Sequence, residues 1–295
     1  MASDNLTDIL FCPDRGECSE LALVLSAQAI PSEVRCDGRF LVLSVPADSV
    51  ARAGDELKAY VAETRRTGSS RPAAAPVQGN PWPGITVYAA AIIVMALMAP
   101  EMHLGVDWLA AGRMDGGRML AGEWWRPVTA LTLHADAGHV LGNLFFGGIF
   151  AFSVSRYFGG GFGWLVIVLS GALGNVANGF LSGADHRSIG ASTAVFAALG
   201  LLSAYLWRLG FPSDASRRER LAPVVAGIGL LAFTGTGGVD TDIGAHLLGF
   251  LVGFGAGLLI ARTGVPVARY AQVVSAAVVS GAIVVAWVAA VTFHA

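Results

Sequence analysis

Seven apolar stretches, each close to the length needed to cross a bilayer, constrain this chain more than any other feature of its sequence. A helix needs about 20 mostly apolar residues to span the hydrocarbon core of a membrane. The predicted spans are residues 84–100, 138–156, 162–182, 190–208, 221–237, 243–261 and 271–292. The fifth is the weakest, because Thr234, Thr236 and several glycines lie near its end. The pattern predicts an all-α polytopic membrane protein.

Charged residues divide the chain into two regions. Only 14% of all residues are charged, whereas about a quarter are charged in ordinary soluble domains. The first 79 residues hold 8 Lys or Arg and 11 Asp or Glu, and the remaining 216 residues hold 21 charged residues. This distribution excludes an ordinary cytosolic enzyme, a nucleic-acid-binding protein and a disordered chain. It predicts a soluble N-terminal piece joined to a membrane piece.

The soluble piece, residues 1–66, is predicted to be a small α+β domain. Its segments follow the order β-α-β-β-α, which is most of a ferredoxin-like half-domain, and Asp37-Gly38 is a strong hairpin signal. Cys12, Cys18 and Cys36 match no zinc-binding spacing, and we expect reduced thiols on the cytoplasmic side. No catalytic constellation is visible, so we expect a docking or regulatory module with a cytoplasmic partner. The other predicted boundaries are a linker at 67–81, a membrane core at 82–263, and a seventh helix with the C-terminus at 264–295.

Arginines and acids in the loops predict the orientation. Arginines precede span one and lie after spans two, four and six, whereas acids lie in the loops after spans three and five. The positive-inside rule then places the N-terminus in the cytoplasm and, with seven spans, the C-terminus outside. Loop 101–137 is long and mixed in charge. Its Trp108, Trp124 and Trp125 suit the headgroup region, so we expect the loop to lie partly in the outer interface.

Few polar residues lie inside the predicted spans, and each is a functional candidate because burying it in hydrocarbon is costly. His139 and Asn143 lie near the start of span two, Ser192 near the start of span four and His246 near the start of span six. These three spans run in the same direction. At a rise of 1.5 Å per residue, all four side chains lie within about 10 Å of the outer end of their helices. Asn175 and Asn178 of span three are expected to make interhelical hydrogen bonds.

Small residues predict close contact between spans four and six. Gly249, Gly253 and Gly257 recur every four residues in span six, and Gly190, Ala194 and Ala198 do so in span four. If those faces meet, Ser192 and His246 come within hydrogen-bond reach. A serine beside a histidine is an activated nucleophile. The plainer alternatives are a serine bonded to its own helix and a packed structural histidine.

Four motifs resemble those of rhomboid intramembrane serine proteases, in the family's order and over residues 84–262. They are Glu123-Trp-Trp-Arg-Pro127 in the first loop, His134-Ala-Asp-Ala-Gly-His139-Val-Leu-Gly-Asn143 in span two, Gly190-Ala-Ser192-Thr-Ala in span four, and Ala245-His246-Leu-Leu-Gly249 in span six. The resemblance implies a rhomboid-like six-helix core. The seventh span matches members that append a helix.

The resemblance also implies roles for individual residues. Ser192 would be the nucleophile and His246 its general base and later acid, with no third carboxylate. The Ser192 backbone N–H at a helix start, with His139 and Asn143, would hold the oxyanion. Gly190 would support this site. The matching motif residues Trp125, Arg126, His134 and Gly249 would be structural.

One residue departs from the family pattern. The position after the nucleophile is usually glycine, and here it is Thr193. Its β-branched side chain could crowd the contact with span six or fit a slightly different packing. Two functions therefore stay open, an active protease and a catalytically inactive rhomboid-like binder or chaperone of membrane proteins. A transporter is disfavoured, because the polar cluster lies near one face and no internal repeat is visible.

The favoured function is a serine endopeptidase that cleaves transmembrane segments of other proteins near the outer membrane boundary. Loop 101–137 and a mobile fifth span would govern substrate access, as the family suggests. No metal or cofactor is expected, because the histidines follow no metal-binding pattern and no nucleotide-binding glycine motif is present. The expected partners are transmembrane substrates and the lipid bilayer, with no nucleic acid. One lysine against 18 arginines suggests a GC-rich bacterial source, hence the inner membrane.

Overall fold

The chain divides into two compact units, Met1–Arg71 and Pro72–Ala295, whose boundary falls within the predicted linker. The computed structural model describes residues 6–12, 15–37, 40–68, 79–211, 215–234 and 241–294. Gly38 of the predicted hairpin turn, linker residues 69–78, and Thr236 at the end of the fifth predicted span lie outside the described residues. Each unit is considered by itself.

The first unit is a three-stranded antiparallel sheet with two helices packed against it. β1 (Leu6–Cys12), β2 (Glu33–Asp37) and β3 (Phe40–Pro46) lie in the order β1-β3-β2, with β3 antiparallel to both neighbours. The helices are α1 (Arg15–Ala27) and α2 (Val50–Gly68), the latter after a short 3-10 turn, η1 (Ala47–Ser49). The core combines apolar residues of all these layers: Cys18, Leu21, Leu25, Leu43, Val45 and Ala53. The β-α-β-β-α order is the predicted one, and a strand between β1 and β2 is the split β-α-β arrangement.

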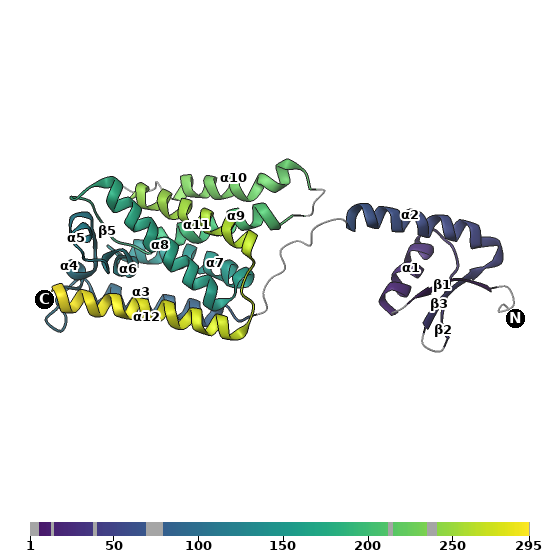
Figure 1. The fold of residues 1–295 in the computed structure, drawn as a ribbon, viewed down its shortest axis with the longest axis horizontal. Coiled ribbons are helices and arrows are strands. Elements are labelled where there is room, and N and C mark those ends of the chain that lie inside the picture. Colours follow the sequence, from purple (N-terminus) through teal and green to yellow (C-terminus); the bar gives the residue numbers. More distant parts are fainter. Residues whose placement is uncertain are drawn as a thin grey trace. The chain divides into compact units, whose positions relative to one another are not determined.

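The second unit contains one helix for each of the seven predicted spans (Figure 1). They are α3 (Trp82–Met98), α7 (Ala137–Phe158), α8 (Gly160–Ser182), α9 (Ser192–Leu209), α10 (Arg217–Thr234), α11 (Ile243–Thr263) and α12 (Arg269–His294). Five of them, α7, α8, α9, α11 and α12, are long and apolar enough to cross a membrane. The apolar α3 has 17 residues. The first turn of α10 carries charged residues, so its apolar part is short.

Helix α9 is the centre of this unit. Every residue from Thr193 to Tyr205 is buried, because α7, α8, α10 and α11 all pack around it. Helices α10 and α12 lie on opposite sides of the bundle (Figure 1). α10 packs mainly against α9, whereas α12 packs against α8 and against the long loop before α7.

That long loop, predicted to lie in the outer interface, is a folded layer. It contains α4 (Trp108–Gly112), β4 (Met114–Asp115), α5 (Gly116–Leu120), α6 (Arg126–Thr129) and η2 (Ala130–Thr132). Trp124 is exposed, as an interfacial anchor would be, but Trp125 is buried and stacks on Phe293 of α12. Trp108 packs against Trp287 of the same helix. The seventh helix therefore stabilises the first loop, which the sequence did not indicate.

Candidate active site

Ser192 and His246 meet at one end of the helical bundle. Ser192 is the first residue of α9, and His246 lies in the first turn of α11. The distance from Ser192 Oγ to His246 Nε2 is 2.8 Å, a hydrogen-bond distance. The imidazole is buried and packs on the ring of Phe196, with centroids 4.5 Å apart. A neutral imidazole whose proton is on Nδ1 can accept the hydroxyl proton at Nε2.

Glycines bring these two helices together, as predicted from span six. A Cβ built on Gly249 would lie 2.3 Å from the Thr193 carbonyl oxygen, and one on Gly253 would lie 2.0 Å from the Ala197 oxygen. A Cβ on Gly257 would lie 2.5 Å from the oxygen of Leu201. The same spacing separates the paired residues along both helices, so α9 and α11 run parallel with their backbones in contact.

The predicted contact face on span four was wrong. The α9 residues against the glycines are Thr193, Ala197 and Leu201, not Gly190, Ala194 and Ala198. Ala194 instead faces α8, where a Cβ on Gly171 would lie 2.7 Å from the Ala194 Cβ. Because α9 is surrounded on all sides, small residues recur on more than one of its faces, and the sequence alone does not say which helix each face meets.

Thr193 fits between two glycines. Its side chain is buried, and its Cγ2 lies against Gly174 of α8 and Gly249 of α11, 3.0 Å from a Cβ built on either. The residue therefore occupies space that glycines on both neighbouring helices leave open. The sequence left open whether Thr193 crowds the contact with span six or fits a slightly different packing. The structure has the second arrangement, and Ser192 stays within hydrogen-bond reach of His246.

The segment before Ser192 is held close to His139 of α7. Gly190 has φ +133°, a conformation that L side chains rarely adopt, and a Cβ there would lie 2.6 Å from His139 Nε2. Its N–H donates to the Ala130 carbonyl, at 2.9 Å. Glycine is thus required at this position both for its backbone angle and for the approach of His139 to the turn that precedes the nucleophile.

His134 contacts the same turn at Ala191. The Ala191 N–H donates to His134 Nε2 at 3.4 Å, and the His134 and His139 rings pack edge to face. Burial, with a smaller contribution from His139, lowers the pKa of His134 to about 4. The imidazole is therefore neutral at physiological pH and keeps the lone pair that accepts from Ala191.

A short ladder ties the first loop to the chain leading to Ser192. β4 pairs with β5 (Arg187–Ser188), and Arg187 Nε lies 3.3 Å from Asp115 Oδ2. Burial raises the pKa of Asp115, but hydrogen bonds from the Arg118 N–H and Arg187, with nearby arginine charges, outweigh it and lower the pKa overall. The carboxylate thus stays ionised and keeps the two segments joined.

Asn143 is buried beside this site, but its side chain turns back to its own helix. Its Nδ2 donates to the His139 backbone carbonyl at 3.0 Å, and the backbone carbonyl of Asn143 accepts from the Tyr88 hydroxyl at 2.8 Å. The oxyanion roles predicted for His139 and Asn143 remain predictions.

The Trp125-Arg126 motif has a structural position. Arg126 is fully buried, and its guanidinium donates to Glu123 and to the carbonyls of Ala110 and Arg113. Trp125 donates to the Ala111 carbonyl at 3.3 Å. These bonds hold the loop around a buried cation, since Arg supplies five donors in a fixed fork. All of these hydrogen bonds join residues of the first loop, which fits the structural role predicted for the motif.

Asp242 was missed as a site residue, although it directly precedes the helix that carries His246. Its side chain caps α11 by accepting from the Ala245 N–H at 2.9 Å. Asn178 of α8 donates to Asp242 Oδ2 at 2.8 Å, which confirms an interhelical bond for that residue, and His186 Nε2 lies 3.0 Å from the same oxygen. Asn175 likewise bonds the Pro127 carbonyl. An aspartate directly before an apolar helix indicates an N-cap, and this signal could have identified Asp242.

Among the residues that the structure describes, no group of three or more His, Cys, Asp or Glu side chains is placed to hold a metal ion. The chemistry available at the site is that of a hydroxyl, imidazoles and backbone amides. Such a set can transfer a proton and form an ester with an acyl group.

Known proteins share this part of the chain. Residues 121–263 match the Rhomboid domain family. YdcA, a rhomboid family protein of Bacillus subtilis (strain 168), is 30% identical over 133 residues, which are 45% of this chain and 65% of that protein. The rhomboid protease GluP of the same organism is 32% identical over 94 residues, 32% of this chain and 18% of its own length. The matches thus span less than two thirds of each relative.

The family match covers every site residue predicted from the sequence, from the loop motif at Trp125 to Gly249 on α11. Together with the apolar helices, it establishes that this chain is an integral multi-pass membrane protein of the rhomboid family.

Proposed function

We propose that this protein is an intramembrane serine endopeptidase that cleaves transmembrane segments of other proteins near the outer boundary of a bacterial inner membrane. The observation that carries the proposal is the 2.8 Å distance between Ser192 Oγ and His246 Nε2 at the ends of two tightly packed membrane helices. Membership of the rhomboid family supports it.

In the proposed first step, Ser192 Oγ attacks the carbonyl carbon of the substrate peptide bond while His246 Nε2 takes the hydroxyl proton. The carbonyl becomes a tetrahedral oxyanion. The Ser192 N–H lies in the first turn of α9, where backbone donors have no intrahelical acceptor, and it would donate to this oxygen. His139, which lies against Gly190, would be a second donor.

The tetrahedral intermediate then collapses. The C–N bond breaks, His246 returns its proton to the leaving amine, and an ester to Ser192 remains. Water attacks this ester with His246 again as the base, which releases the acid product and restores the hydroxyl. Phe196 and the surrounding helices hold the imidazole in one orientation throughout.

The substrate must expose a peptide bond that a helix normally protects. Each amide in a transmembrane helix is bonded within the helix, so cleavage requires local unwinding. Substrates should therefore carry small or helix-weakening residues near the cut. We propose that the first loop and α10 govern access, because α10 packs mainly against one neighbour, α9.

Labelling with a fluorophosphonate probe, measured beside cleavage of a model transmembrane substrate, tests the proposal. The wild-type chain should be labelled and should cleave, whereas Ser192→Ala should do neither. Ser153→Ala is the matched control, since Ser153 is also a membrane-helix serine but bonds its own helix at Ile149. Absence of labelling of Ser192, in conditions where a known rhomboid protease is labelled, would favour the inactive binder, and cleavage by Ser192→Ala would contradict the proposed nucleophile.

A further inference from the structure

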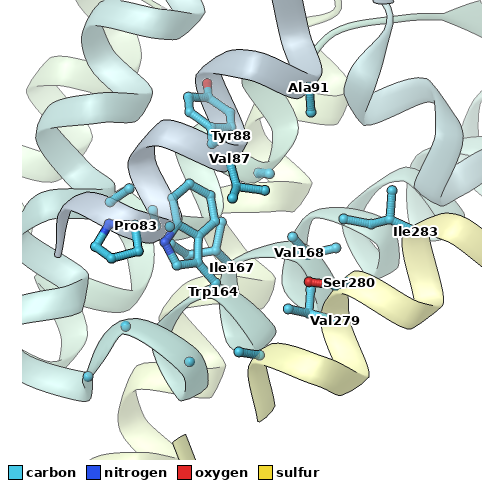
Figure 2. Close-up of a pocket in the computed structure, with 18 of the residues that line it drawn as sticks. Pro83, Val87, Tyr88, Ala91, Trp164, Ile167, Val168, Val279, Ser280 and Ile283 are labelled. Carbon is cyan, nitrogen blue, oxygen red and sulfur yellow. The ribbon is translucent and has the colours of Figure 1, made fainter. Parts of the chain in front are cut away.

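A cavity of about 700 Å³ lies between α3, α8 and α12 (Figure 2), and residues of α7, α9 and η2 also line it, as does Ala191 directly before Ser192. Helices α3 and α12 both pack against α8 and leave this space between them. Its wall is mostly apolar: Val87 and Ala91 from α3, Ile167 and Val168 from α8, and Val279 and Ile283 from α12. The volume is within the range of about 300–1,000 Å³ typical of ligand pockets.

The surroundings determine what can fill this space. An apolar cavity does not hold water, because water needs polar partners. The walls belong to helices that lie in a bilayer, so the fluid that reaches the cavity is lipid hydrocarbon. Along α12 the lining runs from Arg269 to Ile283, a rise of about 21 Å. One leaflet of the hydrocarbon core is about 15 Å thick, so the space is long enough for one acyl chain.

One end of the cavity is polar and positive. Arg269, the first residue of α12, is exposed and is the charged residue among the described residues of the lining. The N-terminal ends of α3 and α8 line the same end, at Asn80 and Gly160. Helix N-termini carry partial positive charge, so three helix starts and a guanidinium converge where a lipid headgroup would lie.

Gln272 fixes the backbone at this polar end of the cavity through its own hydrogen bonds, none of which involves Arg269. Its Oε1 accepts from the N–H groups of Gly161 and Phe162, and its Nε2 donates to the carbonyls of Phe158 and Pro266. The start of α12 is therefore fixed to the turn between α7 and α8. The bonds of Gln272 are made within the protein, whereas Arg269 is an exposed residue of the cavity lining.

We propose that this cavity binds one phospholipid with an anionic headgroup, its acyl chain between α3 and α12 and its phosphate at Arg269. The inference concerns binding and does not rest on the proposed protease activity. Charge complementarity favours an anionic lipid over a zwitterionic one, because Arg269 and the helix starts offer positive charge without an acidic neighbour in the described lining.

Native mass spectrometry tests this on the full chain reconstituted with equal amounts of phosphatidylglycerol and phosphatidylcholine. One retained lipid is expected, with phosphatidylglycerol preferred about fivefold, which corresponds to about 1 kcal/mol for one arginine. Arg269→Gln should remove the preference. Arg262→Gln, at the end of α11 and outside the lining, should keep it.

A second pair of variants tests the acyl chain. Ala91→Phe fills the cavity and should reduce retained lipid severalfold, whereas Ala90→Phe, on an exposed position of α3 outside the lining, should not. Ser280→Phe fills the cavity from α12 and replaces Ala91→Phe if that variant fails to fold. Equal retention of both lipids by wild type would overturn the proposal, and so would equal effects of the two arginine variants or of the two alanine variants. Detection of a dimer without bound lipid, in which a second copy of the chain covers the cavity, would also overturn it.

Discussion

At the scale of single residues, His134 links pH to the packing in front of Ser192. Its imidazole accepts from the Ala191 N–H only while neutral, and burial keeps its pKa at about 4, against an ordinary value of 6.5. Between these two pH values the unfolded chain binds a proton at this residue and the folded chain does not. Stability is therefore lost as the pH falls from 6.5 to 4.

The size of this effect follows from the pKa difference. A shift of about 2.5 units corresponds to a loss of roughly 3 kcal/mol by pH 4. We expect His134→Gln, which keeps an acceptor but does not ionise, to show a smaller fall of Tm over this window. The measurement is thermal unfolding of the detergent-solubilised protein at several pH values. Identical pH slopes for the two proteins would contradict the assignment.

Thr193 provides a second residue-scale prediction. Because its methyl group packs between Gly174 and Gly249, Thr193→Gly should lower stability by about 1 kcal/mol or more, through lost apolar contact and added backbone freedom. Labelling of Ser192 by a fluorophosphonate should continue at a rate close to wild type. A severalfold faster reaction in Thr193→Gly would mean that the threonine crowds the site after all.

At the scale of helices, the contact between α9 and α11 sets the distance between the two reacting side chains. Gly253→Ala would place a Cβ 2.0 Å from a backbone oxygen of α9, so the helices must separate. Overpacking of this kind costs about 1–3 kcal/mol. Since α11 carries His246, both Tm and labelling of Ser192 should fall.

Gly255→Ala is the matched control for that variant. Gly255 is two residues further along α11, and a Cβ there meets nothing within 4 Å. Removing a helix glycine should leave the activity unchanged and raise stability by up to about 1 kcal/mol. If both alanines behave alike in unfolding and labelling, the glycine contact does not set the geometry of the site.

The positions of the helices could be predicted from the sequence, but the faces through which they contact their neighbours could not. Length and apolarity placed all seven segments within a few residues, because a bilayer fixes how long an apolar helix must be. The common depth of Ser192 and His246 followed from counting residues along parallel spans. The contact face of α9 did not follow, because neighbours surround that helix. The folded structure of the first loop could not be predicted either, because Arg126 holds it together through backbone carbonyls 13 and 16 residues earlier in the chain.

At the scale of the whole molecule, charge separates the two ends of the membrane unit. Arg156, Arg208 and Arg262 lie in the last turns of α7, α9 and α11, and Arg269 opens α12. Ser192 and His246 lie at the opposite helix ends, beside Asp242. The N-terminal unit has its own core and all three cysteines of the chain, and its cytoplasmic partner stays a prediction. The positive-inside rule predicts that the arginine end lies in the cytoplasm and the serine end outside.

Cysteine accessibility tests this orientation directly, because the membrane unit has no cysteine of its own. After the three native cysteines are replaced, Asp185→Cys introduces a thiol in the exposed loop before α9, and Ser216→Cys introduces one in the exposed segment before α10. In intact spheroplasts a membrane-impermeant maleimide should label the first variant and not the second, and lysis should allow both to react. The reverse pattern would place Ser192 at the cytoplasmic boundary, and substrates would then be cut on that side, whatever the chemistry of the serine and histidine.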